Sequence, residues 1–260
     1  MAGLGAISIL VLPAPALAAP RRRDFTWPGG GRAAVSLTYD DGLDSQLDNA
    51  APQLDALGLR ATFFVTGENM DARLPDWVAL AGRGHEIADH TVSHPCELGA
   101  YTARSFQRQE LGAMEQYLND NFGVSRGRTF AYPCGLTDLG AGSPARRRAR
   151  YLELMRADFV AARTVEGDPN DPHRLQRDRY RLHAFEPTYD HDEAGLAMDY
   201  VGKAMAKGGW AILVFHEVIE KRLGEGDTST ATHGAILKWI ADAPVWCAPM
   251  AAVLEHIEQA

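Results

Sequence analysis

The sequence lacks three features that would each define a class of protein: an excess of positive charge, a rich complement of cysteine, and a long apolar run beyond its first residues. Its 260 residues carry a formal net charge of −8, which argues against a nucleic-acid backbone or an anionic membrane surface as a partner. The three cysteines, Cys96, Cys134 and Cys247, are too few for a disulfide-stapled scaffold and match no zinc–cysteine spacing. After residue 18, no stretch is long and apolar enough to span a membrane.

Positive charge is nevertheless concentrated in two short runs of arginine, at residues 21–23 and 146–148. Neither run is interleaved with aromatic residues. We therefore interpret both runs as solvated surface rather than as binding sites.

Residues 1–18 are the expected signal peptide. They carry no charged side chain, are largely apolar, and end at an Ala-Leu-Ala-Ala sequence over 16–19 that fits the small-x-small cleavage rule. The stretch is too short to span a membrane, and Pro13 and Pro15 interrupt it. It also lacks the basic residue typical of such segments, so a misplaced start or a disordered tail is the alternative. We expect export to the periplasm or the extracellular space, with an N-terminal linker over 19–31.

From residue 33 onward, short β-like runs alternate with longer helical ones. This alternation predicts a parallel sheet with helices packed on its outside. About seven such repeats favour an α/β barrel over an open sheet, in a single domain over 32–260. Strands are expected over 33–39, 61–65, 85–90, 128–132, 158–162, 180–184 and 210–215. Helices are expected over 45–57, 75–83, 103–121, 146–156, 194–207, 230–241 and 249–258.

Polar side chains gather where the predicted strands end. Asp40 and Asp41 end the first strand, His90 ends the third, the turn 133–135 ends the fourth, and His216 follows the apolar run before it. In parallel barrels the chemistry takes place at the carboxyl ends of the strands. Two adjacent carboxylates repel each other unless a cation or a proton lies between them. The aspartate pair therefore predicts a positively charged partner.

His90 and His94 are four residues apart, and a helical turn would point both imidazoles the same way. Two neutral imidazoles and one carboxylate make a three-ligand metal site that leaves a position open for water, and Asp41 is the natural third ligand. The alternative is two hydrogen-bonded loop histidines. With Asp41 on a metal, Asp40 is left as general base and His216 as proton donor. His216 alone would also fit a hydrogen-bonded histidine at the edge of the core.

These residues resemble the motifs of the polysaccharide deacetylases, that is, carbohydrate esterase family four or the NodB-homology domain. Residues 38–42 (TYDDG) match the motif T-F-D-D-G with Tyr for Phe, and residues 90–95 (HTVSHP) match H-x-x-S-H-P in full. Residues 130–135 (FAYPCG) are similar to F-A-Y-P-Y-G, and residues 213–216 (LVFH) to the last motif. The order and spacing fit from about residue 32 to residue 256.

The resemblance implies a distorted (β/α) barrel of about seven strands that hydrolyses an N- or O-acetyl group on a sugar and releases acetate. It implies a divalent metal on Asp41, His90 and His94, first Zn²⁺, with Co²⁺, Mn²⁺ or Ni²⁺ as alternatives. Asp40 would be the base and His216 the acid. The backbone N–H of Cys134 would help to hold the oxyanion. The remaining oxyanion or substrate contacts implied by the motifs are Tyr132, Pro133, Gly135 and Leu213.

The chain also departs from the family pattern. Many members have an arginine that orients the base where this chain has Ala131. Arg163, after a predicted strand, is expected to replace it, and a surface salt bridge is its alternative role. The motif with an Asp and a Trp has no clear counterpart, so the partner of His216 is open. Cys96 and Cys134 lie in motif loops at the same rim, either bridged or as two free thiols.

The leading hypothesis is an exported, metal-dependent deacetylase of an acetylated polysaccharide or oligosaccharide. A hydrolase of the same fold acting on a non-sugar amide or cyclic imide is the first alternative. A carbohydrate-binding protein that has lost turnover is the second, and the presence of base, ligands and acid together argues against it. Peptidoglycan, chitin oligomers, acetylxylan and acetylated exopolysaccharide are all compatible substrates, and the sequence does not define the oligomeric state.

Overall fold

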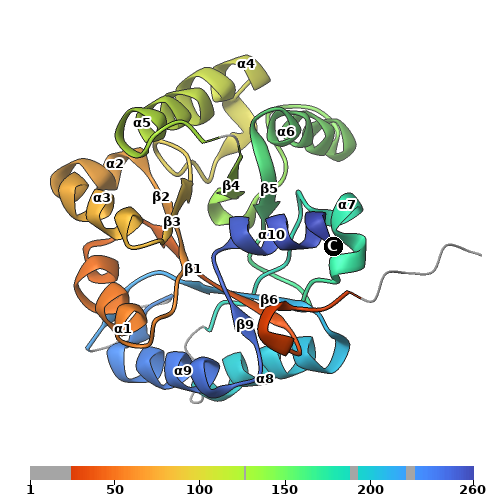
Figure 1. The fold of residues 1–260 in the computed structure, drawn as a ribbon. Coiled ribbons are helices and arrows are strands. Elements are labelled where there is room, and N and C mark those ends of the chain that lie inside the picture. The colour runs from red at the N-terminus through yellow and green to blue at the C-terminus, as the bar shows by residue number, and fades with distance from the viewer. Residues whose placement is uncertain (1–24, 126, 188–192, 221–225) are drawn as a thin grey trace, which may run out of the picture.

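The computed structural model describes residues 25–125, 127–187, 193–220 and 226–260, so the expected signal peptide lies outside the described residues. A curled parallel sheet with the strand order β5-β4-β3-β2-β1-β6 forms the centre, and β9 pairs with β1 (Figure 1). A separate short sheet contains β7 (Val218–Ile219) and β8 (Thr228–Ser229). The strands of the main sheet are β1 Ala34–Asp41, β2 Thr62–Val65, β3 Glu86–Asp89, β4 Arg128–Ala131, β5 Phe159–Arg163, β6 Trp210–Phe215 and β9 Trp246–Cys247.

Helices surround this sheet, as the alternating pattern predicts (Figure 1). The expected helix over 45–57 begins instead as a π-helical turn, Gln46–Ala50, and Ser45 makes no capping bond to it. The long expected helix over 103–121 likewise contains a π-turn, Gln107–Leu111, between α4 and α5. No described helix is long and apolar enough to cross a membrane. The α-helices are α1 Ala51–Ala56, α2 Gly67–Met70, α3 Leu74–Gly82, α4 Ala103–Phe106, α5 Gly112–Phe122, α6 Pro144–Asp158, α7 Leu175–Asp178, α8 Glu193–Lys207, α9 Thr230–Asp242 and α10 Met250–Gln259.

One expected strand, over 180–184, does not form. Leu182 makes a single bridge to Arg163 of β5, and Phe185 makes a single bridge to Leu213 of β6. The segment crosses from one strand to the other instead of running along either, so no ladder of hydrogen bonds develops. It fills the gap between β5 and β6, which makes the barrel distorted rather than regularly closed.

The alternation of side chains along the strands separates an outer core from an inner one. On β1, Val35, Leu37 and Tyr39 pack outward with residues of the surrounding helices. Ala34 on the same strand belongs to an inner cluster that includes Phe64 of β2 and Val214 of β6. Asp40 is on the same face of β1 as Ala34, because the two residues are an even number of positions apart. Its carboxylate is therefore directed into the barrel.

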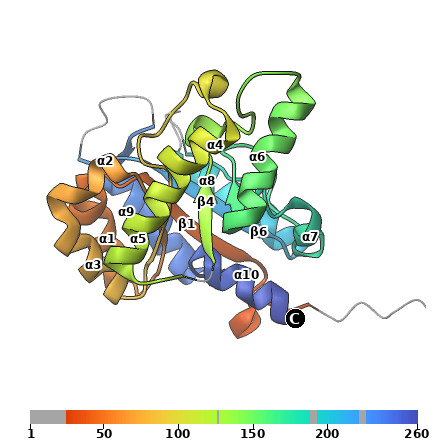
Figure 2. The same ribbon diagram turned by 90° about the horizontal axis from the view of Figure 1, so that it is seen from above.

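The amino end of the barrel is covered by α10. The backbone N–H of Met250 donates to Thr62 Oγ1 at 2.8 Å, and that of Ala251 donates to Glu86 Oε2 at 3.0 Å. Figure 2 shows α10 on the opposite side of the molecule from α4. With this end covered, the carboxyl ends of the strands are left for a site.

The described part of the expected linker, residues 25–31, packs against the domain. Trp27 is only 4% exposed and donates from Nε1 to the carbonyl oxygen of Gly208 at 3.0 Å. The carbonyl oxygen of Thr26 lies 2.8 Å from His256 Nε2 on α10. Residues 25–31, expected as part of a linker, are thus packed against the domain.

We expect Trp27→Ala to lower the free energy of unfolding by about 3 kcal/mol, because a buried indole and its hydrogen bond are both lost. Urea unfolding followed by circular dichroism would measure this. Val124→Ala, at a residue that is 84% exposed, is the control and should change stability by less than about 0.5 kcal/mol. Equal midpoints for the two variants would contradict the packing of residues 25–31.

Candidate active site

Asp40 and Asp41 reach the same cavity because the backbone turns between them. On a regular strand these neighbours would face opposite sides, but Asp41 has a left-handed φ of 75°. Its carbonyl oxygen accepts hydrogen bonds from Thr66 Oγ1 and Asn69 Nδ2, each at 3.0 Å, which fix the turn. Gly42 follows with a φ of 73°. A strained turn of this kind, held by tertiary contacts, is typical of functional sites.

The loop that carries His90 and His94 is also turned back, but not as the expected helical turn. Thr91 and His94 have φ values of 70° and 49°. The Asp89 carboxylate accepts from the Thr91 N–H at 2.7 Å, and Thr91 Oγ1 accepts from the His94 N–H at 3.0 Å. These bonds fold the loop so that the two imidazole rings lie 4.7 Å apart. The two histidines do converge, through a turn the spacing does not predict.

A buried glutamate holds the same loop from outside. Glu110, on the π-turn before α5, is 4% exposed. It accepts from the N–H of Ser93 at 3.0 Å, from Ser93 Oγ at 2.9 Å and from the Tyr101 hydroxyl at 2.9 Å. Ser93 thus has a structural role, since it fixes the loop between the two histidines.

Asp41, His90 and His94 form a cluster with the dimensions of a metal site. Asp41 Oδ1 lies 3.6 Å from Nε2 of both His90 and His94, and all three candidate ligand atoms lie within 4.8 Å of one another. Ligands about 2.1 Å from a tetrahedral zinc ion are separated by about 3.4 Å. The cluster therefore needs only small side-chain movements to hold such an ion.

His90 is in the state that a metal ligand requires. Its Nδ1 lies 2.8 Å from the carbonyl oxygen of Ala131, to which it donates, so Nε2 carries the lone pair. Nε2 is buried and has no hydrogen-bond partner among the described residues. Burial lowers the pKa of His90 to about 4, which keeps the ring neutral at pH 7. A buried, neutral and unpartnered nitrogen fits a divalent cation.

Asp40 is paired with Arg163. Arg163 is fully buried, its Nη2 donates to Asp40 Oδ1, and its guanidinium lies 4.8 Å above the ring of Phe64. Burial raises the pKa of Asp40, but the charge of Arg163 outweighs burial and the net pKa is lowered. Asp40 is therefore ionised at neutral pH. Arg163 is the register partner of Ala131 on the adjacent strand, so the guanidinium enters the barrel at the level where the family arginine would stand.

His216 stands on the other side of Asp40. Tyr39 and Phe215 are register partners on β1 and β6, so the next residue of each strand, Asp40 and His216, is at the same level. Gln46, which is fully buried, donates from Nε2 to the carbonyl oxygens of both, at 3.2 Å for His216. This amide links the two strand ends and fixes the spacing between the two side chains.

Glu186 supplies the partner of His216 that the sequence leaves open. Its Oε1 lies 2.8 Å from His216 Nδ1. Gly226 lies over the pair, and a side chain at this position would place its Cβ 3.6 Å from Oε1 and 3.8 Å from Nδ1. Burial lowers the pKa of His216, but the hydrogen bond to Glu186 and the charge of Asp40 outweigh burial and raise it to about 9. His216 is therefore protonated at pH 7.

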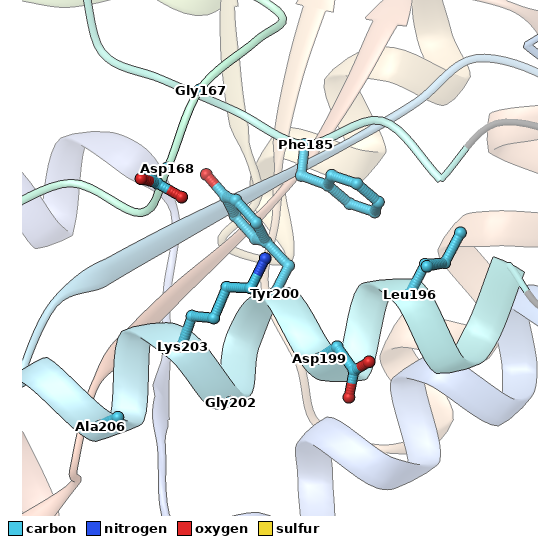
Figure 3. Close-up of a pocket in the computed structure, with 9 residues that line it drawn as sticks. All are labelled: Gly167, Asp168, Phe185, Leu196, Asp199, Tyr200, Gly202, Lys203 and Ala206. Carbon is cyan, nitrogen blue, oxygen red and sulfur yellow. The ribbon is translucent and has the colours of Figure 1, made fainter.

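The wall of a neighbouring cavity fixes Glu186. This cavity, of about 560 Å³, lies on the flank of the barrel between Asp168 and α8 (Figure 3). Phe185 lines it and stacks on Tyr200 with ring centroids 5.0 Å apart. Because Phe185 is also bridged to Leu213, the next residue, Glu186, is held toward His216. None of the predicted catalytic or metal residues lines this cavity.

The turn 133–135 is joined by a disulfide to the loop that carries the candidate metal ligand His94. Cys134 has a φ of 54°, and its sulfur is bonded to that of Cys96, with the Cα atoms 5.7 Å apart. Cys96 Sγ in turn lies 3.8 Å from His94 Nδ1. Of the two possibilities for Cys96 and Cys134, the structure has the bridge. The bond connects the loop of a candidate metal ligand to the loop whose backbone is expected to hold the oxyanion.

The other residues of the motifs lie around this turn, with one exception. Pro133 is buried in the turn, Gly135 has a φ of 63°, and the hydroxyl of buried Tyr132 donates to the carbonyl oxygen of Tyr180 at 3.0 Å. Leu213, expected as a substrate contact, is fully buried in the outer core. Because side chains alternate along the strand, Leu213 faces the same way as Phe215 and opposite to His216, so it faces away from the site.

Three comparisons place this geometry among known proteins. Residues 29–151 match the family described as polysaccharide deacetylase. A peptidoglycan-N-acetylglucosamine deacetylase of Bacillus cereus is 44% identical over 68 residues, which are 25% of this chain and 24% of that protein. The matched segments span between 5% and 40% of the length of the curated relatives.

Solved structures show the same fold at low sequence identity. A putative polysaccharide deacetylase from Mycobacterium smegmatis has a TM-score of 0.67 at 18% identity, with 90% of this chain and 93% of that chain covered. A pseudoenzyme of carbohydrate esterase family four from Bacillus anthracis has a TM-score of 0.56 at 15% identity, with 86% and 66% covered. The resemblance seen in the motifs is thus confirmed over the matched part of the chain: residues 29–151 match the polysaccharide deacetylase family, and the fold is the distorted barrel of the similar solved structures.

Proposed function

We propose that this protein is a metal-dependent hydrolase that removes acetyl groups from a polysaccharide or oligosaccharide and releases acetate. The observation that carries the proposal is the separation of the two aspartates. Asp41 faces Nε2 of both His90 and His94, whereas Asp40 faces a buried guanidinium. A metal-ligand cluster and an ionised base thus stand side by side, with a protonated histidine opposite them.

Asp40 is the general base. Its pKa is lowered by Arg163 despite burial, so at neutral pH it is ionised and accepts a proton from the attacking water. Arg163 also fixes the direction of the carboxylate, since one oxygen is occupied by Nη2 and the other, Oδ2, points toward His90 at 3.7 Å. A base held in one orientation reduces the reorganisation needed in the transition state.

His216 is the general acid. With its pKa raised to about 9 it carries a proton at neutral pH and donates it to the leaving nitrogen or oxygen of the sugar. The Cys134 backbone N–H donates to the developing oxyanion. A substrate acetyl group would then lie between the turn 133–135 and Asp40.

Asp41, His90 and His94 would hold the divalent metal, with Zn²⁺ as the best fit to two imidazoles and one carboxylate. When bound, the cation supplies Lewis-acid polarisation of the acetyl carbonyl and acidifies a neighbouring water. Burial keeps His90 neutral for this purpose.

An N-acetylated amino sugar is the first substrate to consider, because the Bacillus cereus relative is a deacetylase of N-acetylglucosamine in peptidoglycan. Export is part of the proposal, and the Cys96–Cys134 bond supports it, since disulfides persist in oxidising compartments. A sugar-binding protein without turnover is the alternative that the Bacillus anthracis pseudoenzyme brings forward. The complete set of base, ligands and acid favours an active enzyme here.

Acetate release from N-acetylglucosamine oligomers, peptidoglycan and acetylxylan tests the proposal directly. We expect acetate from at least one of these polymers, loss of activity after chelation, and recovery on addition of zinc. Saccharide binding without acetate release under all these conditions would favour the pseudoenzyme alternative. Acetate or ammonia release from simple amides or imides alone would favour the non-sugar hydrolase.

Arg163→Met should move the acid limb of the pH–rate profile to higher pH by about 1–2 units, because the pKa of Asp40 rises when its cation is removed. Below this pKa the base is protonated and inactive, so a higher pKa moves the acid limb to higher pH. The profile of kcat/KM against pH measures the shift. An unchanged acid limb in a folded variant would show that Arg163 does not control the ionisation of the base.

Glu186→Gln should move the alkaline limb of the same profile to lower pH, by about one unit or more, because the pKa of His216 falls when the carboxylate is neutralised. Above its pKa the acid has lost its proton, so activity is lost earlier as pH rises. The acid limb should stay in place. A shift of both limbs together would contradict the separate roles of Asp40 and His216.

Breaking the Cys96–Cys134 bond should lower the free energy of unfolding by about 4 kcal/mol, from the loop entropy of the 38-residue separation. Urea unfolding with and without dithiothreitol measures this, and Cys247→Ala should keep the full dependence on reductant. Titration of the unfolded, non-reduced protein should find one reactive thiol, that of Cys247. Three reactive thiols would exclude the bridge.

A further inference from the structure

Beyond the turn 133–135 the surface is hollowed by two adjoining cavities. The larger, of about 310 Å³, begins at Cys134 and Gly135 and extends to Thr137 and Arg181. The smaller, of about 140 Å³, shares Thr137 and Arg181 and ends at Arg148. We call these two cavities together the arginine groove. It begins at the backbone expected to hold the oxyanion and leads away from the metal cluster.

The crossing segment between β5 and β6 directs Arg181 into this groove. Leu182 is fixed to β5 by two backbone bonds, from its N–H to Ala162 at 2.9 Å and from the Thr164 N–H to its carbonyl oxygen at 2.8 Å. Leu182 and Ala184 are each 1% exposed. Because side chains alternate along extended backbone, Arg181 and His183 face the opposite way, and both are exposed and line the larger cavity.

Arg181 differs from the neighbouring arginines in having no carboxylate partner within the described residues. Arg147 and Arg148 both pair with Asp138, at 3.1 and 3.2 Å, and Arg177 pairs with Asp178 at 2.6 Å. An arginine that is not neutralised by its own protein is available to an anionic ligand, and its planar donors match a carboxylate. The position of Arg181 where both cavities meet makes that ligand part of the groove.

We propose that the arginine groove binds the sugar next to the acetylated one, and that Arg181 recognises a carboxylate carried by that sugar. This inference rests on the proposed function, since the acetyl group is taken to lie at Cys134. The substrate class it names is an acetylated glycan in which the neighbouring sugar is anionic. Two sources have this chemistry: the lactyl carboxylate of peptidoglycan strands freed of their peptides, and the uronic acids of acidic polysaccharides.

Glu166 places a second charge in the groove, of opposite sign to that of Arg181. It lines the larger cavity with Arg181, is exposed, and makes no ion pair with another described residue. Its negative charge would repel the same substrate carboxylate that Arg181 attracts. Neutralising the two residues should therefore change the binding of an anionic glycan in opposite directions, whereas a merely structural role would not.

The test compares acetate-release kinetics on three substrates: neutral N-acetylglucosamine oligomers, peptidoglycan strands stripped of peptides by an amidase, and O-acetylated oligogalacturonates. For Arg181→Gln we expect KM to rise about tenfold or more on one or both anionic substrates, with kcat retained and the neutral oligomers unaffected. Glu166→Gln should lower KM on the same anionic substrate. The substrate that responds identifies the source of the carboxylate.

Arg177→Gln, at an exposed arginine outside the groove, is the matched control and should leave KM unchanged on all three substrates. Equal kinetics of Arg181→Gln and wild type on both anionic substrates, or an equal loss on neutral and anionic substrates, would overturn the proposal while the deacetylase function stood. If the wild type releases no acetate from any substrate, the proposed function fails. In that case, calorimetric binding of the stripped strands and the oligogalacturonates tests whether the arginine groove binds an anionic sugar. A loss of affinity in Arg181→Gln supports the proposal. An affinity equal to that of the wild type, or no binding by the wild type, overturns it.

Discussion

The ion pair between Asp40 and Arg163 is the interaction on which the site depends. Both side chains are almost completely buried inside the barrel, where an unpaired charge would cost several kcal/mol. They come from β1 and β5, which are separated in the sheet by β2, β3 and β4, and are 123 residues apart in sequence. The pair lets one carboxylate of the aspartate couple stay ionised beside the other. Where many members of the family have an arginine, this chain has Ala131, and its register partner on the next strand, Arg163, provides the guanidinium instead.

Backbone strain around this pair is balanced by the surrounding contacts. Among the described residues, the four non-glycine residues with a positive φ all lie at the site: Asp41, Thr91, His94 and Cys134. Each conformation costs of order 1–3 kcal/mol on its own. Hydrogen bonds from Thr66 and Asn69, the carboxylates of Asp89 and Glu110, and the Cys96–Cys134 bond hold these turns in place. The converging ligands are therefore a product of the whole carboxyl edge, not of the motif alone.

Site residues that a local sequence pattern marks were predicted, and site residues that act on distant parts of the chain were not. The strand ends located Asp40, Asp41, His90 and His216, and a lone basic residue after an apolar strand located Arg163. Glu186, Glu110 and Gln46 were not found, because each acts on residues far along the chain or across a loop and no local spacing marks it. The helical turn expected for His90 and His94 was wrong because hydrogen bonds of Asp89 and Thr91 favour left-handed backbone. Strict alternation along 210–216, applied to Leu213, would have shown that it faces outward when His216 faces inward.

The division of labour between the two aspartates is the central claim, and zinc titration of the purified, metal-free protein by calorimetry tests it most directly. Asp40→Asn should bind one zinc ion with an affinity close to that of the wild type, while Asp41→Asn should lose affinity by about tenfold to a hundredfold or more. Both variants should keep the circular dichroism spectrum of the wild type. Loss of zinc binding in Asp40→Asn, or full binding in Asp41→Asn, would contradict the assignment of one carboxylate to the metal and the other to the proton.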